Sequence, residues 1–196
     1  MSPVQTTHDP SAIASEPEPH HWVERYADYL YSYAFNRLDH DEQARDLVQD
    51  TFLAALEKVG QFQGNSSERT WLTAILKYKI IDVYRKKNSG LRTLSTDDEP
   101  ELEFFESGNG HWKEQYTPRP MPMEGADPLV NKELAAILKK CLFKLPALWL
   151  SVFTMKHMDD TATKTICEEL KVTPANFWVI IHRAKLNLRA CIQRSW

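Results

Sequence analysis

The 196-residue chain, with 42% hydrophobic residues, is large enough for one or two compact domains with modest cores. Its net charge of −3 and pI near 6.2 exclude a protein that coats nucleic acid by charge alone. The charge is unevenly distributed, because residues 1–88 carry −3, residues 89–128 carry −6 and residues 129–196 carry +6. The sequence therefore predicts a basic carboxyl-terminal module joined to acidic material.

The three cysteines, Cys141, Cys167 and Cys191, are far apart and form no Cys-x-x-Cys pair. An odd count fits a reducing compartment better than a disulfide framework, and cysteines on apolar helix faces are most simply core residues. The sequence has no secretory signal and no apolar run near the roughly 20 residues that a membrane span needs. We expect a soluble cytoplasmic protein without membrane insertion, cofactor or metal site.

The first half of the chain reads as a tail followed by a helical domain. Residues 1–20 contain four prolines and little that could be buried, which indicates a flexible tail. Residues 21–88 show helical spacing in three stretches, and Gly60 and Gly64 interrupt it before the third. Ser66 or Ser67 is positioned to cap that third helix.

The second half is predicted to be an acidic linker and another helical domain. Residues 89–128 are rich in glycine, proline and acidic residues, and we expect them to act inside a basic channel with aromatic anchors at Phe104, Phe105, Trp112 and Tyr116. Residues 129–196 return to helical spacing. No strand-like alternation occurs, so the predicted fold class is all-α, with two small helical domains joined by a long linker.

The carboxyl-terminal segment has the pattern of a helix-turn-helix. Ile166 and Leu170 give a short apolar face, residues 171–172 turn the chain, and Thr173 caps a helix whose first residue is Pro174. The predicted buried stripe of that helix is Phe177, Ile181, Ala184, Leu188 and either Cys191 or Ile192.

The opposite face of this last helix combines polar, basic and aromatic side chains: Asn176, Trp178, Val179, His182, Arg183, Lys185 and Arg189. Cations one turn apart suit phosphates, and the first turns of such a helix meet base edges in a major groove. An ordinary solvated face is the alternative interpretation. Lys171 departs from the pattern, because this turn favours glycine with a positive φ. Either a lysine there costs around 1 kcal/mol, or the turn is built differently.

The stretch Thr70–Lys87 mixes aromatic and cationic side chains on one helix. Its predicted core stripe is Leu72, Leu76, Ile80 and Val83. Its remaining face carries Thr70, Trp71, Ala74, Lys77, Tyr78, Ile81, Tyr84 and Arg85. Aromatic planes stack on unpaired bases and cations hold the backbone, so this face suits single-stranded DNA. The alternative for Trp71 is that it completes the helical core.

Two DNA-directed modules in this order resemble a known family. "ARDLVQDTFLAAL" followed by "FQGNSSERTWLTAILKYKIIDVYRKK" resembles region 2 of the sigma-70 family, and residues 145–189 resemble its region 4. Having these regions and little else is typical of the extracytoplasmic-function group of bacterial sigma factors. The resemblance implies a promoter-specificity subunit that binds core RNA polymerase through its beta-prime clamp and beta subunits, binds promoter DNA and is restrained by an anti-sigma factor.

The resemblance also implies roles for particular residues. Docking on the beta-prime clamp falls to Asp46, Leu47, Gln49 and Asp50. The alternative for Leu47 is a place in the core, and Phe52 of the same motif is interpreted as core. Capture and melting of the minus-10 element fall to Gln63, Gly64, Asn65, Ser66, Ser67, Trp71, Lys77, Tyr78 and Arg85. Reading of the minus-35 element falls to Asn176, Trp178, Val179, His182 and Arg183, with Lys185 and Arg189 on phosphates.

Three other functions are weighed against this one. A polymerase-independent helix-turn-helix regulator would explain the last third of the chain. It would give no function to the helices that contain Asp46 and Trp71. A sigma-like decoy that only binds an anti-sigma factor is disfavoured by the basic faces of both modules. An enzyme is least favoured, because the His, Asp and Cys residues show no metal spacing or catalytic triad.

Overall fold

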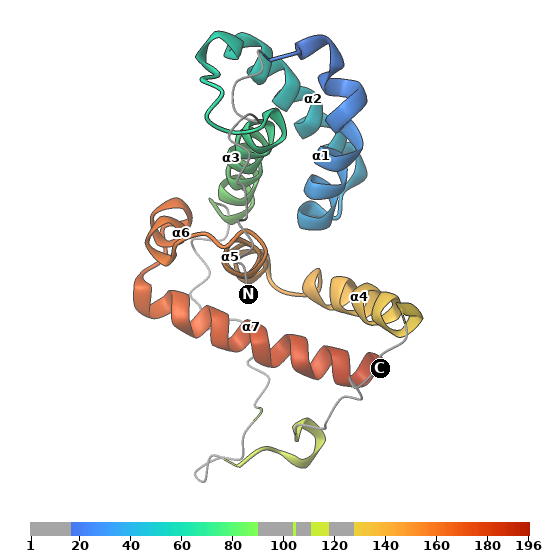
Figure 1. Ribbon diagram of the computed structural model, residues 1–196. Coiled ribbons are helices and arrows are strands. Elements are labelled where there is room, and N and C mark those ends of the chain that lie inside the picture. Colours follow the sequence, from blue (N-terminus) through green and yellow to red (C-terminus); the bar gives the residue numbers. More distant parts are fainter. Residues whose placement is uncertain (1–16, 90–103, 105–110, 118–127) are drawn as a thin grey trace, which may run out of the picture. The chain divides into compact units, whose positions relative to one another are not determined.

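The computed structural model of the chain describes residues 17–89, 104, 111–117 and 128–196 (Figure 1). The regular elements within these ranges are all helices, which confirms the all-α prediction. They form two compact units that divide between Asp82 and Val83. The expected tail up to residue 16 and most of the expected linker, Phe105 included, lie outside the described residues.

The first unit contains α1 (Trp22–Leu38), α2 (Asp41–Glu57) and most of α3 (Glu68–Ser89), together with the short helices η2 (Pro19–His21) and η3 (Val59–Gln61). A two-residue connection joins α1 to α2, which lie side by side in Figure 1. Asp39 ends α1 in a left-handed conformation with φ 49°, and the imidazole of His40 accepts a hydrogen bond from the Gln43 amide to begin α2.

Side chains at helical spacing form the core of this unit. Phe52 is buried, as its core interpretation predicts, and so are Leu72, Leu76 and Ile80 of the expected α3 stripe. The other buried apolar residues of the three helices up to Asp82 are Trp22, Leu30, Ala34, Leu38, Ala44, Val48 and Ala55.

Glu68, the first residue of α3, ties this helix to the start of α1. Its carboxylate accepts hydrogen bonds from the Trp22 indole at 2.6 Å, the Tyr26 hydroxyl at 2.9 Å and the Glu18 amide at 2.7 Å. Burial acts to raise the pKa of Glu68, but these bonds outweigh burial and the pKa lies below its usual value. The three donors therefore fix the point at which the loop before α3 ends.

The second unit contains α4 (Pro128–Leu142), α5 (Ala147–His157), α6 (Thr163–Leu170) and α7 (Pro174–Ser195), with the short helix η4 (Glu114–Tyr116). The long α7 packs against the other three, and α5 also packs against α6 (Figure 1). The predicted stripe of α7 is buried at Phe177, Ile181, Ala184 and Leu188, and Ile180 joins it.

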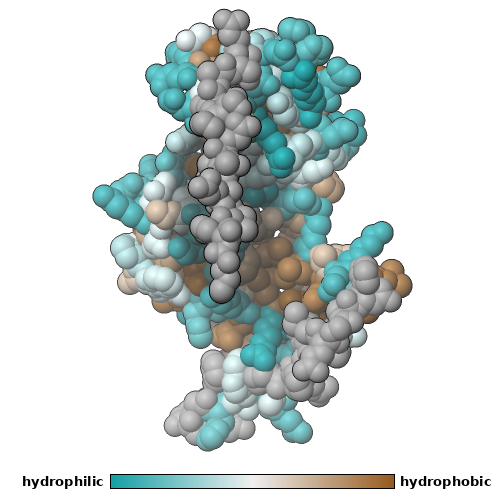
Figure 2. All heavy atoms as spheres, in the orientation of Figure 1, coloured by the Kyte–Doolittle hydropathy of each residue, from teal (hydrophilic) through white to brown (hydrophobic). Residues whose placement is uncertain are grey.

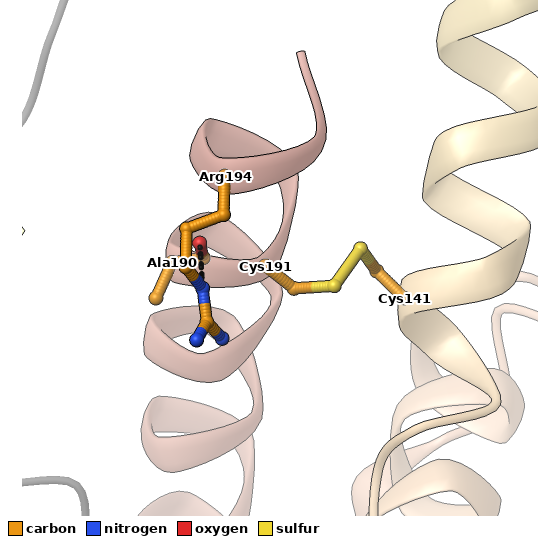
Figure 3. Close-up of a disulfide and its surroundings, with 4 residues drawn as sticks. All are labelled: Cys141, Ala190, Cys191 and Arg194. Atoms are coloured by element: carbon orange, nitrogen blue, oxygen red, sulfur yellow. Dashed lines mark hydrogen bonds between the residues drawn. A yellow bond between two sulfur atoms is a disulfide. The ribbon is translucent and has the colours of Figure 1, made fainter.

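Cys141 of α4 and Cys191 of α7 form a disulfide, with their Cα atoms 5.8 Å apart (Figure 3). Both residues are buried, as the core interpretation predicts, but the expectation of unpaired cysteines is wrong for these two. The pairing arises because α4 packs along α7, a tertiary contact that cysteine spacing does not encode. Cys167 is free and half-buried.

The turn between α6 and α7 has the geometry that the sequence predicts. Lys171 ends α6 in the left-handed region, with φ 55° and ψ 41°, and Thr173 caps α7 by accepting a hydrogen bond from the Asn176 amide. The exposed lysine therefore occupies a conformation that glycine adopts without steric cost.

We expect Lys171→Gly to raise the free energy of unfolding by up to about 1 kcal/mol, because it removes the Cβ strain of a left-handed residue. Lys185→Gly, at another exposed lysine but within α7, is the matched control and should lower it by about 1 kcal/mol. Urea denaturation of both variants measures the two effects. Destabilisation by both substitutions would show that Lys171 bears no strain.

Candidate nucleic-acid interface

The exposed surface of α2 carries the residues expected to dock on the polymerase. Asp46, Gln49 and Asp50 are exposed, and Leu47 is half-buried. Leu53 and Leu56, which the sequence reading did not include in this site, are 60% and 47% exposed on the same helix. Residues 46, 49, 50, 53 and 56 follow helical spacing, so carboxylates and leucines share one unburied face. Such a mixed face is typical of a protein-binding surface.

The loop between η3 and α3 contains the residues expected to capture a base. Gly64 has φ 68°, a left-handed conformation that explains glycine at this position. Gln63, Asn65 and Ser66 are exposed, and Nδ2 of Asn65 donates a hydrogen bond to the side-chain Oε1 of Gln63 at 3.1 Å. These amides lie at the loop surface, where they can exchange their mutual bond for bonds to a ligand.

Ser67 performs the capping role that the sequence assigned to it or Ser66. Its hydroxyl accepts a hydrogen bond from the Thr70 amide at 3.2 Å, and its carbonyl accepts the Trp71 amide at 3.1 Å. The Ser66 hydroxyl instead faces the Ser67 carbonyl at 3.5 Å, which is a weak contact. The helix start is thus fixed by one serine, and the other is not needed for it.

Beside this loop, the first unit has a groove of about 490 Å³ that sequence reasoning did not foresee. It is lined by Tyr29 of α1, Ser67, and the α3 residues Arg69, Thr70, Thr73, Ala74 and Lys77. The Arg69 guanidinium lies 3.9 Å from the centre of the Tyr29 ring. Ser67 and Lys77 were expected at the site, and Thr70 and Ala74 were expected on the same DNA-directed face of the helix. Tyr29, Arg69 and Thr73 were not expected.

The electrostatics of the groove favour an anionic ligand. Burial acts to raise the pKa of Tyr29, but hydrogen bonds with Thr73 and Arg69 and the nearby positive charge lower it overall. An aromatic ring, hydroxyl groups and two cations in one groove suit a single unstacked nucleotide.

The aromatic residues of α3 divide between core and surface. Tyr78 is 68% exposed, whereas Tyr84 is buried at 2% exposure, so its expected place on the open face is wrong. Trp71 is half-exposed, with its ring centroid 5.7 Å from Trp22 and 5.2 Å from Phe62. Trp71 therefore packs on core aromatic rings, as the alternative interpretation predicts, and is also partly exposed to solvent. Arg85 is exposed near the end of α3.

The outward face of α7 carries the residues expected to read duplex DNA. Trp178 is 59% and Val179 is 42% exposed, and His182 is exposed one turn further along the helix. Lys185 and Arg189 are exposed on the following turns, while Asn176 and Arg183 are half-exposed. All seven expected residues thus lie outside the buried stripe of α7.

Part of the expected linker contacts α7. Phe104 is buried against Trp112 and Tyr116, with ring centroids 6.5 and 5.0 Å away. The Arg189 guanidinium lies 5.8 Å from the centre of the Trp112 ring, so one expected phosphate contact is adjacent to this aromatic cluster. Three of the four expected anchors are therefore gathered in one place.

On the face shown in Figure 2, hydrophilic side chains dominate over α1 and α2, whereas hydrophobic side chains gather among hydrophilic ones over the helices of the second unit. Among the described residues, no group of three or more His, Cys, Asp or Glu side chains is placed to hold a metal ion. No helix within the described ranges is long and apolar enough to cross a membrane.

Comparison with known proteins gives consistent matches. Residues 22–90 match the family model for sigma-70 region 2. The chain is 32% identical over 167 residues to a probable RNA polymerase sigma factor of Haemophilus influenzae, with 85% of each chain covered. It is also 30% identical over 181 residues to the RNA polymerase sigma factor YlaC of Bacillus subtilis, covering 87% of this chain and 90% of that one.

Two further similarities are more distant. The ECF RNA polymerase sigma factor SigW of Bacillus subtilis is 26% identical over 167 residues, covering 85% of this chain and 84% of that one. Among solved structures, the sigma factor RpoE from Bartonella quintana, crystallised with the anti-sigma factor NepR, matches with 18% identity and a TM-score of 0.44. That match covers 89% of this chain and 96% of the other.

Proposed function

Because the chain belongs to the extracytoplasmic-function group of the sigma-70 family, we propose that it is a promoter-specificity subunit of RNA polymerase. In this role it binds core polymerase, recognises the minus-35 and minus-10 promoter elements and helps to melt DNA. One observation supports the proposal above all. The side chains proposed to bind polymerase on α2, the minus-10 element in the loop before α3, and the minus-35 element on α7 are mostly exposed.

The three surfaces have different chemistry, which supports a division of labour. The carboxylates on α2 repel phosphate but can pair with basic residues of the polymerase, so this surface binds protein. The loop and the Tyr29 groove accept an extruded minus-10 base, with Lys77 on its phosphate and Tyr78 as a stacking plane. The face of α7 enters the major groove of the minus-35 element.

The remaining parts of the proposal follow from the family and the same surfaces. The chain acts in the cytoplasm with the polymerase and catalyses no reaction of its own, since it supplies contacts to DNA and protein. An anti-sigma factor is the expected restraint on it. The domain limits that we propose are 21–88 for the minus-10 module and 129–196 for the minus-35 module, with the linker between them.

We expect the isolated chain to bind promoter duplex weakly and with little sequence preference at physiological salt. It is acidic overall and its few basic contacts give little counterion release, whereas core polymerase can hold both modules at a fixed separation. With core polymerase, the chain should protect two separated elements and make the melted strand reactive to permanganate. Tight, specific binding by the isolated chain without melting would instead support a free-standing regulator.

A loop variant tests the melting role within the same experiment. Asn65→Ala should reduce permanganate reactivity about tenfold, because it removes amide hydrogen bonds to the extruded base, and should leave the upstream footprint unchanged. Asn65 is exposed and its described side-chain bond is to Gln63 of the same loop, so the fold should persist. Gln61→Ala, at an exposed residue just before the loop, is the control.

A further inference from the structure

The first two turns of α7 present an exposed tryptophan and valine that the fold does not require. Trp178 is 59% and Val179 is 42% exposed, although the helix is already held by Phe177, Ile180 and Ile181, which are at most 5% exposed. The Trp178 ring touches only the edge of its neighbour among the described aromatic contacts, with a centroid distance of 5.1 Å to Phe177. Large apolar side chains kept in water without a packing role mark a binding surface.

The same two turns lack the side chains that read guanine. Residues 174–181 contain no lysine or arginine, and those are the residues that bond both acceptors of guanine in the major groove. Exposed or half-exposed cations begin at Arg183 and continue with Lys185 and Arg189, a spacing suited to the DNA backbone. Within α7, the basic side chains therefore flank the apolar pair on one side only, toward the carboxyl end of the helix.

The side chains in the first two turns of α7 match the major-groove edge of an A·T pair. Asn176 offers an amide, which pairs with the two major-groove groups of adenine, and apolar side chains contact the 5-methyl group of thymine. The adjacent cations supply charge complementarity to a nucleic acid and disfavour a basic protein surface as occupant. Thr173, which caps α7, holds the Asn176 backbone in place through the Asn176 amide.

We propose that Trp178 and Val179 read thymine methyl groups in the upstream promoter element, so that the base pairs beneath the first two turns of α7 are A·T pairs. This inference rests on the proposed function, since it places α7 in the major groove. In this proposal, Trp178 and Val179 distinguish A·T from G·C pairs, a task that lysine or arginine performs at sites containing guanine.

The test uses uracil, which keeps every hydrogen-bonding group of thymine and lacks only the methyl. Holoenzyme reconstituted from core polymerase and the full chain selects duplexes from a library randomised in the upstream element. The selected duplex is then prepared with thymine or with uracil in that element. Each lost methyl contact should weaken binding about fourfold, so two contacts give about 15-fold.

Variants distinguish methyl reading from a general loss of binding. Trp178→Ala and Val179→Ala should each weaken binding to the thymine duplex and shrink the ratio between thymine and uracil duplexes about fourfold. Lys185→Ala, the matched control on the same face, should weaken binding to both duplexes equally and leave that ratio unchanged. Thermal melting should be unaffected by Trp178→Ala, because the side chain is exposed.

Each contrary outcome has a distinct meaning. Equal binding of wild-type holoenzyme to thymine and uracil duplexes, or selection of guanine-rich sites, would overturn methyl reading. Transcription from the selected duplexes would still support the proposed function in that case. A loss of binding in Trp178→Ala that is equal for both duplexes would likewise overturn it. No start-site-specific transcription from any duplex would overturn the proposed function itself.

Discussion

Changing both Asp46 and Gln49 to arginine is expected to weaken binding to core RNA polymerase about 100-fold or more. Both side chains are exposed on the unburied face of α2, so the substitutions should leave the fold intact. They replace a carboxylate and an amide by cations that would meet basic residues of the clamp, and like charges at an interface cost several kcal/mol. Co-purification of tagged chain with core polymerase, followed by a titration, measures the loss.

The control for this double variant carries the same change in charge elsewhere in the first unit. Glu24→Arg with Gln61→Arg also raises the net charge by three at exposed positions, on α1 and η3, and should bind core polymerase normally. If the control loses binding equally, net charge and not the α2 face is responsible. Normal binding by the folded Asp46 and Gln49 variant would remove α2 from the docking surface.

Leu53→Ala separates a docking role from a packing role on the same face. Leu53 is 60% exposed, so truncation should change the free energy of unfolding by less than about 0.5 kcal/mol. At an interface the same truncation should weaken core binding about tenfold. Phe52→Ala, at the buried neighbouring residue, should instead lower the free energy of unfolding more than it weakens core binding, since it leaves a cavity in the core.

Local chemistry explains the parts of the fold that could be read from sequence. Thr173 at the cap, Pro174 at the first helical position and an apolar stripe at helical spacing are properties of neighbouring residues. The turn pattern also predicts a left-handed residue at position 171, although the lysine there left a different turn geometry open. These features depend little on the rest of the molecule, and the structure has them where the sequence places them.

The parts that could not be read depend on partners distant in sequence. Tyr29 enters the candidate groove because α1 lies beside the start of α3, which places its ring under the Arg69 guanidinium. Tyr84 falls on the polar side of a helical wheel and is nevertheless buried. Helical periodicity ranks the faces of one helix, but it does not state which neighbours cover them.

Leu53 and Leu56 show that helical spacing alone does not assign an apolar residue to the core. An apolar residue at helical spacing is ordinarily assigned to the core, yet α2 already buries Val48, Phe52 and Ala55 on its inner face. The two leucines remain 60% and 47% exposed, which enlarges the candidate docking surface beyond the polar residues of the motif. Their function could be inferred only after the buried face had been located.

The disulfide between Cys141 and Cys191 is expected to contribute about 4 kcal/mol to the stability of the second unit. The bond closes a loop with a sequence separation of 50, and closing such a loop restricts the unfolded chain to about this extent. Treatment with a reducing agent should therefore lower the free energy of unfolding by about 4 kcal/mol, because α4 is then held on α7 by packing alone.

Two cysteine variants make the prediction specific. Cys167→Ala, which removes the free and half-buried thiol, should keep the full response to reductant, whereas Cys141→Ala with Cys191→Ala should show none and should match the reduced wild-type chain within about 1 kcal/mol. Urea denaturation with and without reductant gives these differences. Because Cys141 and Cys191 are buried, alkylation is carried out on the urea-unfolded chain and followed by mass spectrometry. It should label Cys167 alone before reduction and all three cysteines after it. Labelling of Cys141 and Cys191 in the unreduced chain would contradict the pairing, and equal denaturation midpoints with and without reductant would contradict its contribution to stability.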